Sequence, residues 1–271
     1  MKRANHNLLI GLLIVGVLAV MTLVSLVYTP HDVNAMHRDH RFEGPSSRFW
    51  LGTDNFGRDI FSRVMHGGRT AFFVGTTAVA IGLIAGTLIG ALSGYAGTWV
   101  DEIFMRLMDG LLAFPGLIMA LMVIAIAGPG TFNTAVAIGI MSVPTISRIA
   151  RSGFLQYRTT DFVQAARTIG VRPVTIMVRH ILPNVTSSLV VAASVAFATA
   201  ILSEAGLSYL GLGVQPPTPS WGRMLREAQG HFLRTPWFTL APGLAITLMV
   251  LGFYMVSNGV RDALDVRGHH L

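Results

Sequence analysis

Six long apolar runs are the feature that most restricts how this chain can fold. They cover residues 8–28, 71–95, 104–127, 132–150, 187–206 and 238–258. Each approaches the length of about 20 residues that a helix needs to cross the hydrocarbon core of a bilayer. The composition agrees, because 52% of the 271 residues are hydrophobic, 12% are charged and the mean hydropathy is +0.59. We therefore predict an all-α membrane protein with six transmembrane helices.

The residue types that are missing exclude several kinds of chemistry. The chain has no cysteine, so it can form neither a disulfide nor a thiolate metal site. Lys2 is its only lysine, which rules out a phosphate-binding loop ending in Gly-Lys-Ser or Gly-Lys-Thr. We predict a non-catalytic protein with no cofactor or metal of its own, so that any ATP hydrolysis takes place in a partner. The arginines lie beside apolar runs, which argues against binding to nucleic acid.

An even number of spans places both termini on the same side of the membrane. Lys2 and Arg3, the arginines between residues 148 and 179, and Arg261 and Arg267 then share that side, which the positive-inside rule makes cytoplasmic. The loop between the first two runs opposes this orientation with several arginines of its own. That loop is long and contains acidic residues, and the rule is weakest for long loops. We predict that both termini are cytoplasmic.

The runs divide the chain into three parts. Residues 1–70 would hold the first transmembrane helix and a long external loop, residues 71–258 a five-helix core, and residues 259–271 a cytoplasmic tail. Within the core, the polar segment 161–184 would form a cytoplasmic loop between the fourth and fifth spans.

The second span carries a stripe of small residues. One recurs at every fourth position, so all of them lie on one helix face and let a neighbouring helix approach closely. The pattern does not say whether that neighbour belongs to the same chain. The positions are Ala78, Gly82, Gly86, Gly90 and Gly94.

Few prolines and carboxylates fall within the runs. Pro115, Pro144 and Pro242 each remove a backbone hydrogen bond and permit a kink, which suits a rigid bundle and a moving gate equally well. Asp109 and Glu204 are the acidic candidates at membrane depth. Since neither lies at mid-membrane, we expect each to pair with an arginine or to cap a broken helix. This argues against a carrier coupled to protons or sodium.

The segment 161–184 predicts two short helices joined by a turn. Asp161 can cap a first helix, which Gly170 ends as a left-handed residue. Pro173 suits the first turn of a second helix, which would end before Pro183. The result would be a compact basic knob for docking onto another protein, and an ordinary basic cytoplasmic loop is the alternative.

The same segment resembles the coupling loop, or EAA loop, of bacterial ABC importer permeases. The family pattern is Glu-Ala-Ala, three residues, Gly, nine residues, then Ile-x-Leu-Pro. Gln164 replaces the usual Glu and His180 the usual Ile, and the variant with His180 resembles the dipeptide, oligopeptide and nickel branch. The resemblance assigns coupling to the ATPase to Gln164, Ala165, Ala166, Gly170, Arg179, His180, Leu182 and Pro183.

Further stretches resemble this branch across residues 8–267. Residues 50–59 read WLGTDNFGRD, which is similar to a signature that precedes the second span. Residues 204–213 and 217–222 resemble the C-terminal half of the family, and residues 261–265 resemble its usual ending.

Local chemistry gives other residues a structural role. Asp54 and Asp59 can bind nearby backbone amides, and Ser220 can cap a short amphipathic helix. The loop and tail histidines match no compact metal-ligand set, so we expect them to be solvated. They are His31, His37, His40, His269 and His270.

The resemblance implies the second permease subunit, or C type, of a peptide/nickel-type importer in a bacterial inner membrane, with the type I permease fold. It implies a homologous permease partner, two cytoplasmic ATPase subunits that use ATP and Mg²⁺, and an extracytoplasmic solute-binding protein. The expected solute is a dipeptide or oligopeptide, and nickel, a metal–metallophore complex, glutathione and heme are alternatives. A stand-alone carrier or channel is the alternative from another class, and it should show mid-membrane charges or rings of polar residues.

Overall fold

The computed structural model describes residues 6–268, with side chains up to residue 263. Across these residues the regular secondary structure is helical, apart from one isolated β-bridge between Thr53 and Asp59. The elements are α1 (His6–Ser25), a 3₁₀ turn (Arg38–His40), α2 (Ile60–Ala96), α3 (Thr98–Leu112), α4 (Gly116–Ala127), α5 (Thr131–Tyr157), α6 (Asp161–Thr168), α7 (Pro173–Thr175), a π-helical stretch (Ile176–Ile181), α8 (Leu182–Tyr209), α9 (Trp221–Ala228) and α10 (Pro236–Gly268).

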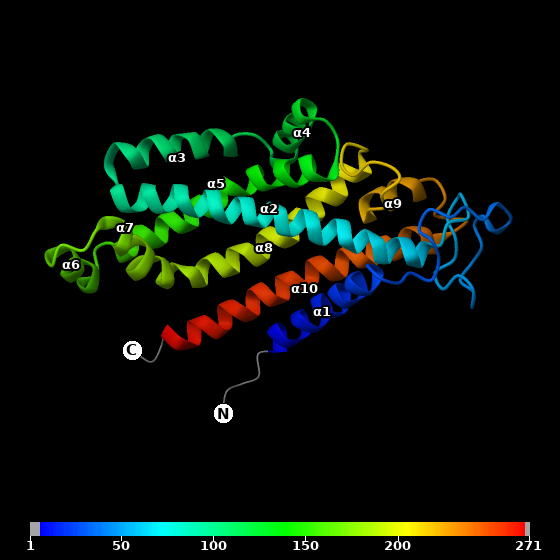
Figure 1. Cartoon of the computed structure of the whole chain (residues 1–271), viewed down its shortest axis with the longest axis horizontal. Helices are drawn as coiled ribbons and strands as arrows, with labels where there is room; N and C mark the ends of the chain where they lie inside the picture. The colour runs from blue at the N-terminus through cyan, green and yellow to red at the C-terminus, as the bar shows by residue number, and fades with distance from the viewer. Residues whose placement is uncertain (1–5, 269–271) are drawn as a thin grey trace.

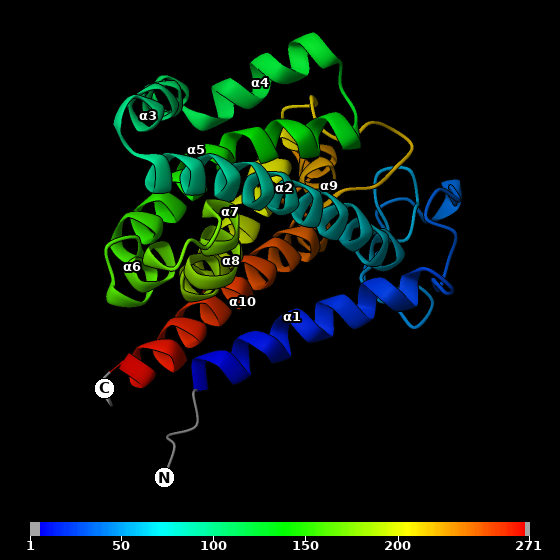
Figure 2. The ribbon, with the colours of Figure 1, turned by 60° about the vertical axis from the view of Figure 1, so that its left-hand side comes forward.

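The helices form an elongated bundle (Figures 1 and 2). α2, α5, α8 and α10 run through its length, α1 lies along α10, and α3 and α4 lie on the opposite side from α1. One end of the bundle carries α6 and α7, and the other carries α9 and the loop of residues 26–59. These are called the α6 end and the α9 end. The start of α1 and the end of α10 both point toward the α6 end.

Among the described residues, five helices are long and apolar enough to cross a membrane. They are α1, α2, α5, the continuous helix Pro173–Tyr209 and α10, while α3 and α4 pass the same test only together. The six predicted runs therefore correspond to five continuous helices and one bent pair. α2 begins at Ile60, well before the apolar run that predicted it, and α10 continues to Gly268.

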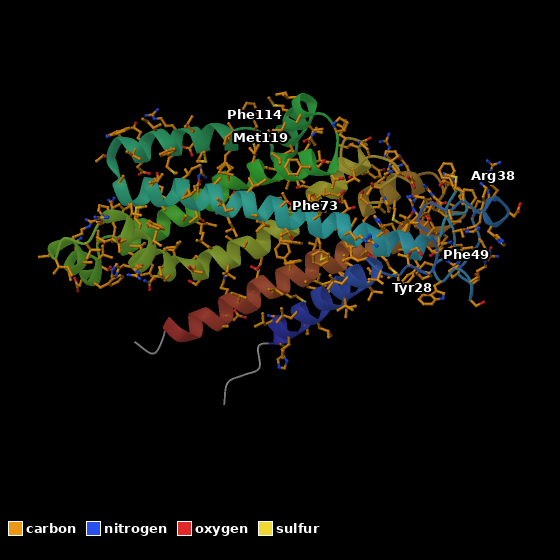
Figure 3. The ribbon with its side chains drawn as sticks, viewed as in Figure 1. Tyr28, Arg38, Phe49, Phe73, Phe114 and Met119 are labelled. Carbon is orange, nitrogen blue, oxygen red and sulfur yellow. The ribbon has the colours of Figure 1, made fainter. Side chains whose placement is uncertain are left out.

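The prediction of a single kinked helix over 104–127 is wrong, because α3 and α4 are separated and bent by 91°. Pro115 has no N–H to donate, and its ring disfavours the helical conformation for Phe114. Figure 3 shows Phe114 at this elbow. Pro144 and Pro242, by contrast, lie within α5 and α10, which continue past them.

The small-residue stripe of α2 faces α5 of the same chain. All five members of the stripe are buried. A Cβ atom on Gly86 would lie 2.9 Å from the Cβ of Ile146, and one on Gly94 would lie 2.7 Å from the carbonyl oxygen of Arg151. The two helices approach so closely that a side chain at these positions would displace the neighbour.

Buried ion pairs hold the α9 end together. Glu227 of α9 accepts hydrogen bonds from Arg58 at 2.6 Å, Arg63 at 3.0 Å and Arg223 at 3.0 Å. Arg58 also donates to Asp54 at 2.6 Å. The cluster links the loop 26–59 and the start of α2 to α9.

The local predictions for this end are confirmed. Asp54 accepts from the backbone N–H groups two and four residues later, at 2.8 and 2.9 Å. Asp59 caps α2 by accepting from the N–H three residues later at 2.9 Å, and Ser220 caps α9 in the same way at 3.3 Å.

Candidate functional site

Residues 161–184 form the α6 end of the bundle. The N-cap of α6 is Thr160, and Asp161 is the first helical residue, so the predicted cap is wrong by one position. Gly170 has φ +78°, the left-handed conformation predicted for it. Its N–H donates to the carbonyl of Arg167 at 3.0 Å, which ends α6. Pro173 occupies the first turn of α7, also as predicted.

The prediction that the second short helix ends before Pro183 is wrong. It passes through the π-helical stretch and becomes α8, a continuous helix from Pro173 to Tyr209. The N–H of Leu182 donates to the carbonyl of Met177, five residues back instead of four. Pro183 has no N–H, and its ring clashes with the carbonyl four residues earlier in a regular α-helix, so the wider π turn accommodates it.

The predicted coupling residues divide by exposure. The buried one, Ala166, faces the bundle together with Val163 of the same helix. The half-buried ones lie where the π-helical stretch joins α8. The exposed ones are Gln164, Ala165, Gly170, Arg179 and Pro183, and the half-buried ones are His180 and Leu182.

Four exposed apolar side chains in this region escaped the sequence reasoning. Phe162 is 44% exposed, Ile169 79%, Val174 70% and Val178 55%. One signal could have indicated them. The segment contains more apolar residues than its buried face can hold, because Val163, Ala166, Ile176 and Ile181 already fill that face. With Arg172 and Arg179, which are also exposed, the four exposed apolar side chains form what we call the α6–α7 surface.

The α6–α7 surface rests on a rigid base. Ile176 and Ile181 are fully buried in a cluster with Val163 and with Phe154 of α5. Arg167 lies over the ring of Tyr95, at the end of α2, with its guanidinium carbon 5.0 Å from the ring centroid. A force applied to this surface would therefore reach α2, α5 and α8 directly.

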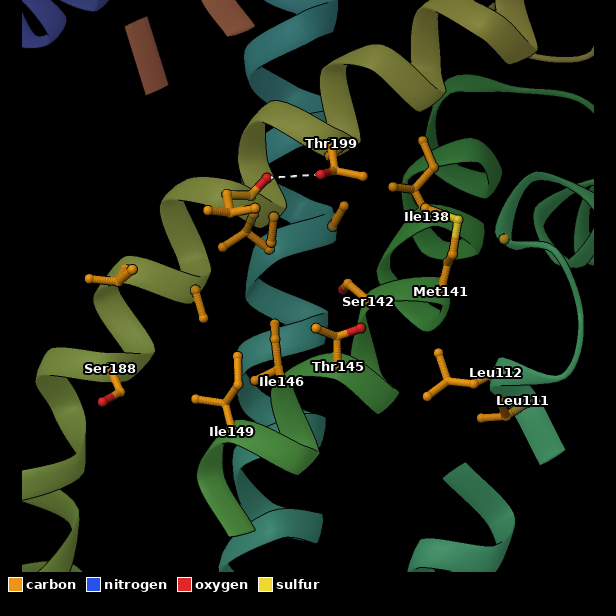
Figure 4. Close-up of a pocket in the computed structure, with 18 of the residues that line it drawn as sticks. Leu111, Leu112, Ile138, Met141, Ser142, Thr145, Ile146, Ile149, Ser188 and Thr199 are labelled. Carbon is orange, nitrogen blue, oxygen red and sulfur yellow. Dashed lines mark hydrogen bonds between the residues drawn. The ribbon is translucent and has the colours of Figure 1, made fainter. Parts of the chain in front are cut away.

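A hollow of about 670 Å³ opens within the bundle between α2, α3, α4, α5, α8 and the end of α10 (Figure 4). Its wall is mostly apolar, with side chains such as Ile138, Met141 and Ile149. The polar side chains that line it are Ser142, Thr145, Ser187, Ser188, Thr199 and Arg261.

The acidic candidates within the helices differ in their partners. Asp109 pairs with Arg148 at 2.5 Å, which confirms the predicted ion pair. Glu204 is buried and accepts a hydrogen bond from Ser208 at 2.7 Å. Neither predicted role holds for Glu204, because α8 is unbroken there and the hydroxyl one turn later satisfies the carboxyl group.

The histidines of the loop 26–59 pack around one aromatic ring. The ring centroids of His31, His37 and His40 lie 4.8, 5.7 and 5.7 Å from that of Phe49, which is buried at the α9 end (Figure 3). These three histidines are half-buried, so the prediction that they are solvated is wrong for them. No group of three potential metal ligands occurs among the described residues. His269 and His270 lie outside them, as do Lys2, Arg3 and the Arg267 side chain.

Comparison with known proteins identifies the family to which this architecture belongs. The family model for the inner membrane component of binding-protein-dependent transport systems matches residues 86–268. The dipeptide transport system permease protein DppC of Alkalihalophilus pseudofirmus is 40% identical over 263 residues, which cover 97% of this chain and 86% of that protein. The glutathione transport system permease protein GsiD of Pectobacterium atrosepticum is 42% identical over 254 residues, covering 92% and 84%.

The fold has a counterpart among solved structures. An inward-facing structure of the MetNI methionine ABC transporter matches with a TM-score of 0.55 and 17% identity, over 74% of this chain and 95% of that chain. The chain thus belongs to the family of inner membrane components of binding-protein-dependent transport systems, and it is a permease subunit of an ABC importer with the type I permease fold.

Proposed function

We propose that this subunit conducts short peptides through the hollow in its bundle. The relatives that match almost the whole chain are permeases named for dipeptides and for glutathione, itself a small peptide. The volume of about 670 Å³ falls within the range of about 300–1,000 Å³ that is usual for small-molecule sites.

The side chains that line the hollow favour a peptide over a metal ion as the solute. Hydroxyl groups can bind peptide N–H and C=O groups, and apolar residues accept side chains of many kinds. Arg261 is the charged residue among the described side chains that line the hollow; it would repel Ni²⁺ and attract the carboxylate of a peptide. Glutathione also satisfies these requirements, whereas a bare transition-metal ion prefers imidazole, thiolate or carboxylate ligands.

The machine that we propose has four kinds of subunit. A homologous permease would complete the path as a heterodimer, an extracytoplasmic binding protein would deliver the solute, and two ATPase subunits would use ATP and Mg²⁺. Residues 1–70 would supply the first span and an external loop, residues 71–258 the transport core, and residues 259–271 a cytoplasmic tail.

The α6–α7 surface is the part that we assign to ATPase coupling. Exposed Ile169 and Val174 would enter an apolar groove on the ATPase, and Arg172 and Arg179 would meet acidic groups at its rim. This assignment places the α6 end in the cytoplasm. The start of α1 and the end of α10 point the same way, which supports cytoplasmic termini.

Reconstitution tests the proposed function. The complete transporter is placed in liposomes with its binding protein, and the uptake of a labelled dipeptide, of glutathione and of Ni²⁺ is followed with and without ATP. We expect ATP-dependent uptake of the dipeptide that unlabelled short peptides inhibit. ATP-dependent uptake of Ni²⁺ without uptake of any peptide would overturn the assignment.

A further inference from the structure

The hydroxyl groups along α8 occupy different depths of the hollow. α8 begins at the α6 end, so Ser187 and Ser188 lie near that end, while Thr199 lies about three turns further along the helix. Figure 4 shows Ser188 and Thr199 well apart on this helix. The hollow therefore has a hydroxyl pair close to the end from which solute would leave.

Arg261 lines the same hollow as this hydroxyl pair. α10 packs against α8 and ends toward the α6 end. Ser257 of α10 donates to the carbonyl of Val191 of α8 at 3.4 Å. Arg261, one turn further toward the α6 end, then lies beside the first turns of α8, and it lines the same hollow as the two serines.

The hydroxyls of Ser187 and Ser188 are available for a ligand. Thr186, Ser194 and Thr199 of the same helix donate to the carbonyl four residues earlier, at 2.8, 3.1 and 3.0 Å. Ser187 and Ser188 form no such bond with any described residue.

Within the described part of the chain, the guanidinium of Arg261 is likewise uncommitted. Two arginines of α5, Arg148 and Arg151, form ion pairs at 2.5 Å with carboxylates of α3. Arg261 is exposed and has no ion-pair partner among the described residues. Such a guanidinium, with no ion-pair partner among the residues whose side chains are described, lines the same hollow as two hydroxyls and offers several donors to one anion.

We infer that Arg261, Ser187 and Ser188 bind the C-terminal carboxylate of a peptide at the α6 end of the hollow. This inference rests on the proposed function, because it takes the solute to be a peptide. The guanidinium supplies a planar pair of N–H donors that match a carboxylate, and the hydroxyls supply further donors. The apolar wall deeper in the hollow makes no charged contact, so the terminus is recognised while the side chains of the peptide vary.

The test compares a dipeptide with a free carboxylate and the same dipeptide as its C-terminal amide. Initial uptake of each is measured at saturating loaded binding protein, in liposomes that hold the wild-type transporter or the Arg261→Gln variant. The same binding protein serves both transporters, so its own preference cancels when the two acid-to-amide ratios are compared. We expect Arg261→Gln to reduce the ratio by about 10-fold, as loss of a charged hydrogen bond does.

Conservative and control variants separate recognition from structure. Arg261→Lys should retain part of the preference, and the double variant Ser187→Ala with Ser188→Ala should reduce it by about 3-fold, as loss of a neutral hydrogen bond does. Arg179→Gln, on the α6–α7 surface, should lower uptake of both peptides by the same factor.

Two results would overturn the inference. An unchanged ratio in both the Arg261→Gln and the double serine variant would show that these residues do not bind the carboxylate, although wild-type peptide uptake, and with it the proposed function, would stand. Failure of the wild-type transporter to import either peptide would remove the proposed function and this inference together.

Discussion

Gly170 fixes the α6–α7 surface through a single backbone conformation. Its φ of +78° lets its N–H and that of Val171 close the end of α6, by donating to Arg167 and Ala166 at 3.0 Å each. A Cβ atom at this position would have no neighbour within 4 Å, so a side chain would cost energy only through the backbone. For a residue other than Gly, Asn or Asp, that cost is about 1–2 kcal/mol.

Substitutions of Gly170 should therefore separate backbone strain from charge. Gly170→Val should reduce solute uptake sharply, because strain tilts α7 relative to α6, whereas Gly170→Asn should retain most uptake. Gly170→Asp has nearly the shape of Asn but adds a negative charge to a basic surface, so it should fall below Asn. Uptake is measured against membrane abundance and the amount of ATPase that co-purifies. Normal uptake by Gly170→Val at normal abundance would show that this turn is not the coupling element.

The carboxylate of Glu227 pairs with three arginines at the α9 end. Its side chain is only 14% exposed, so Glu227→Gln leaves the largely buried Arg58, Arg63 and Arg223 with Asp54 as their one remaining carboxylate partner in the cluster. We expect the variant to lose about 3 kcal/mol of stability, as for other broken buried pairs. The control is Glu102→Gln, because Glu102 pairs with Arg106 at the surface, where the two side chains are 62% and 78% exposed. The control should lose at most about 0.5 kcal/mol.

Thermal unfolding of the detergent-solubilised subunit measures both changes. Equal melting temperatures for the Glu227→Gln and Glu102→Gln variants would contradict the assigned role of the cluster.

At the residue scale, the sequence predicts the features that depend on interactions between residues close together in the chain. Gly170, Pro173 and Ser220 act on backbone groups within a few positions, so their roles follow from residue type and spacing. The contact of Arg58 with Glu227 joins residues 169 positions apart, and no local pattern indicates it. In the same way, no local pattern indicates that Arg261 lines the same hollow as the serines of α8.

Among the elements, the pairing of α2 with α5 depends on glycine at the contact. Gly86→Ala puts a Cβ atom 2.9 Å from that of Ile146, and overpacking of this kind costs about 1–3 kcal/mol. Gly16→Ala is the matched control, since the same substitution in α1 meets nothing within 4 Å. We expect a lower melting temperature for Gly86→Ala and an unchanged or slightly higher one for Gly16→Ala. Equal melting temperatures would mean that α2 and α5 pack less closely than described.

The π-helical stretch is the element that connects the α6–α7 surface to α8. If Pro183 causes the wide turn, Pro183→Ala should allow the N–H of Leu182 to bond to the carbonyl of Val178, in the regular α-helical register. One residue of register turns the helix by about 100° and shifts it by about 1.5 Å, so the surface would rotate relative to α8. Uptake should fall while the ATPase still binds the complex.

Because the chain has no cysteine, paired spin labels can measure this rotation. Thr168→Cys in α6 and Val190→Cys in α8 replace exposed residues on either side of the stretch. Their distance distribution should shift by several ångströms when Pro183→Ala is added. An identical distribution would show that Pro183 does not maintain the π turn.

At the element scale, periodicity and hydropathy predicted the helices but not their directions. Hydropathy detects the apolar run 104–127 without indicating that the chain turns by 91° inside it. The small-residue stripe predicted close packing and left its partner open, because partner choice depends on how all the helices are arranged. The π turn was missed because proline usually signals the end of a helix, whereas here the helix widens and continues.

For the whole molecule, composition and ordered motifs were sufficient to predict a type I permease of an ABC importer. Apolar length dictates spanning helices, and motifs along most of the chain match the family that the comparisons identify. The hollow could not be predicted from the sequence, because its wall combines residues from six helices that only the assembled bundle brings together.

The orientation of the bundle follows from the proposed coupling role and can be measured independently. If the α6 end is cytoplasmic, single cysteines at Ser47 and Thr218, both at the α9 end, should react with an impermeant thiol reagent in intact spheroplasts. A cysteine at Thr168 should react only after permeabilisation, because α6 would face the cytoplasm. Labelling of Thr168→Cys in intact spheroplasts, with Ser47→Cys protected, would show that the molecule has the opposite orientation. The α6–α7 surface would then lie on the side without ATP, where it could not receive the force of hydrolysis.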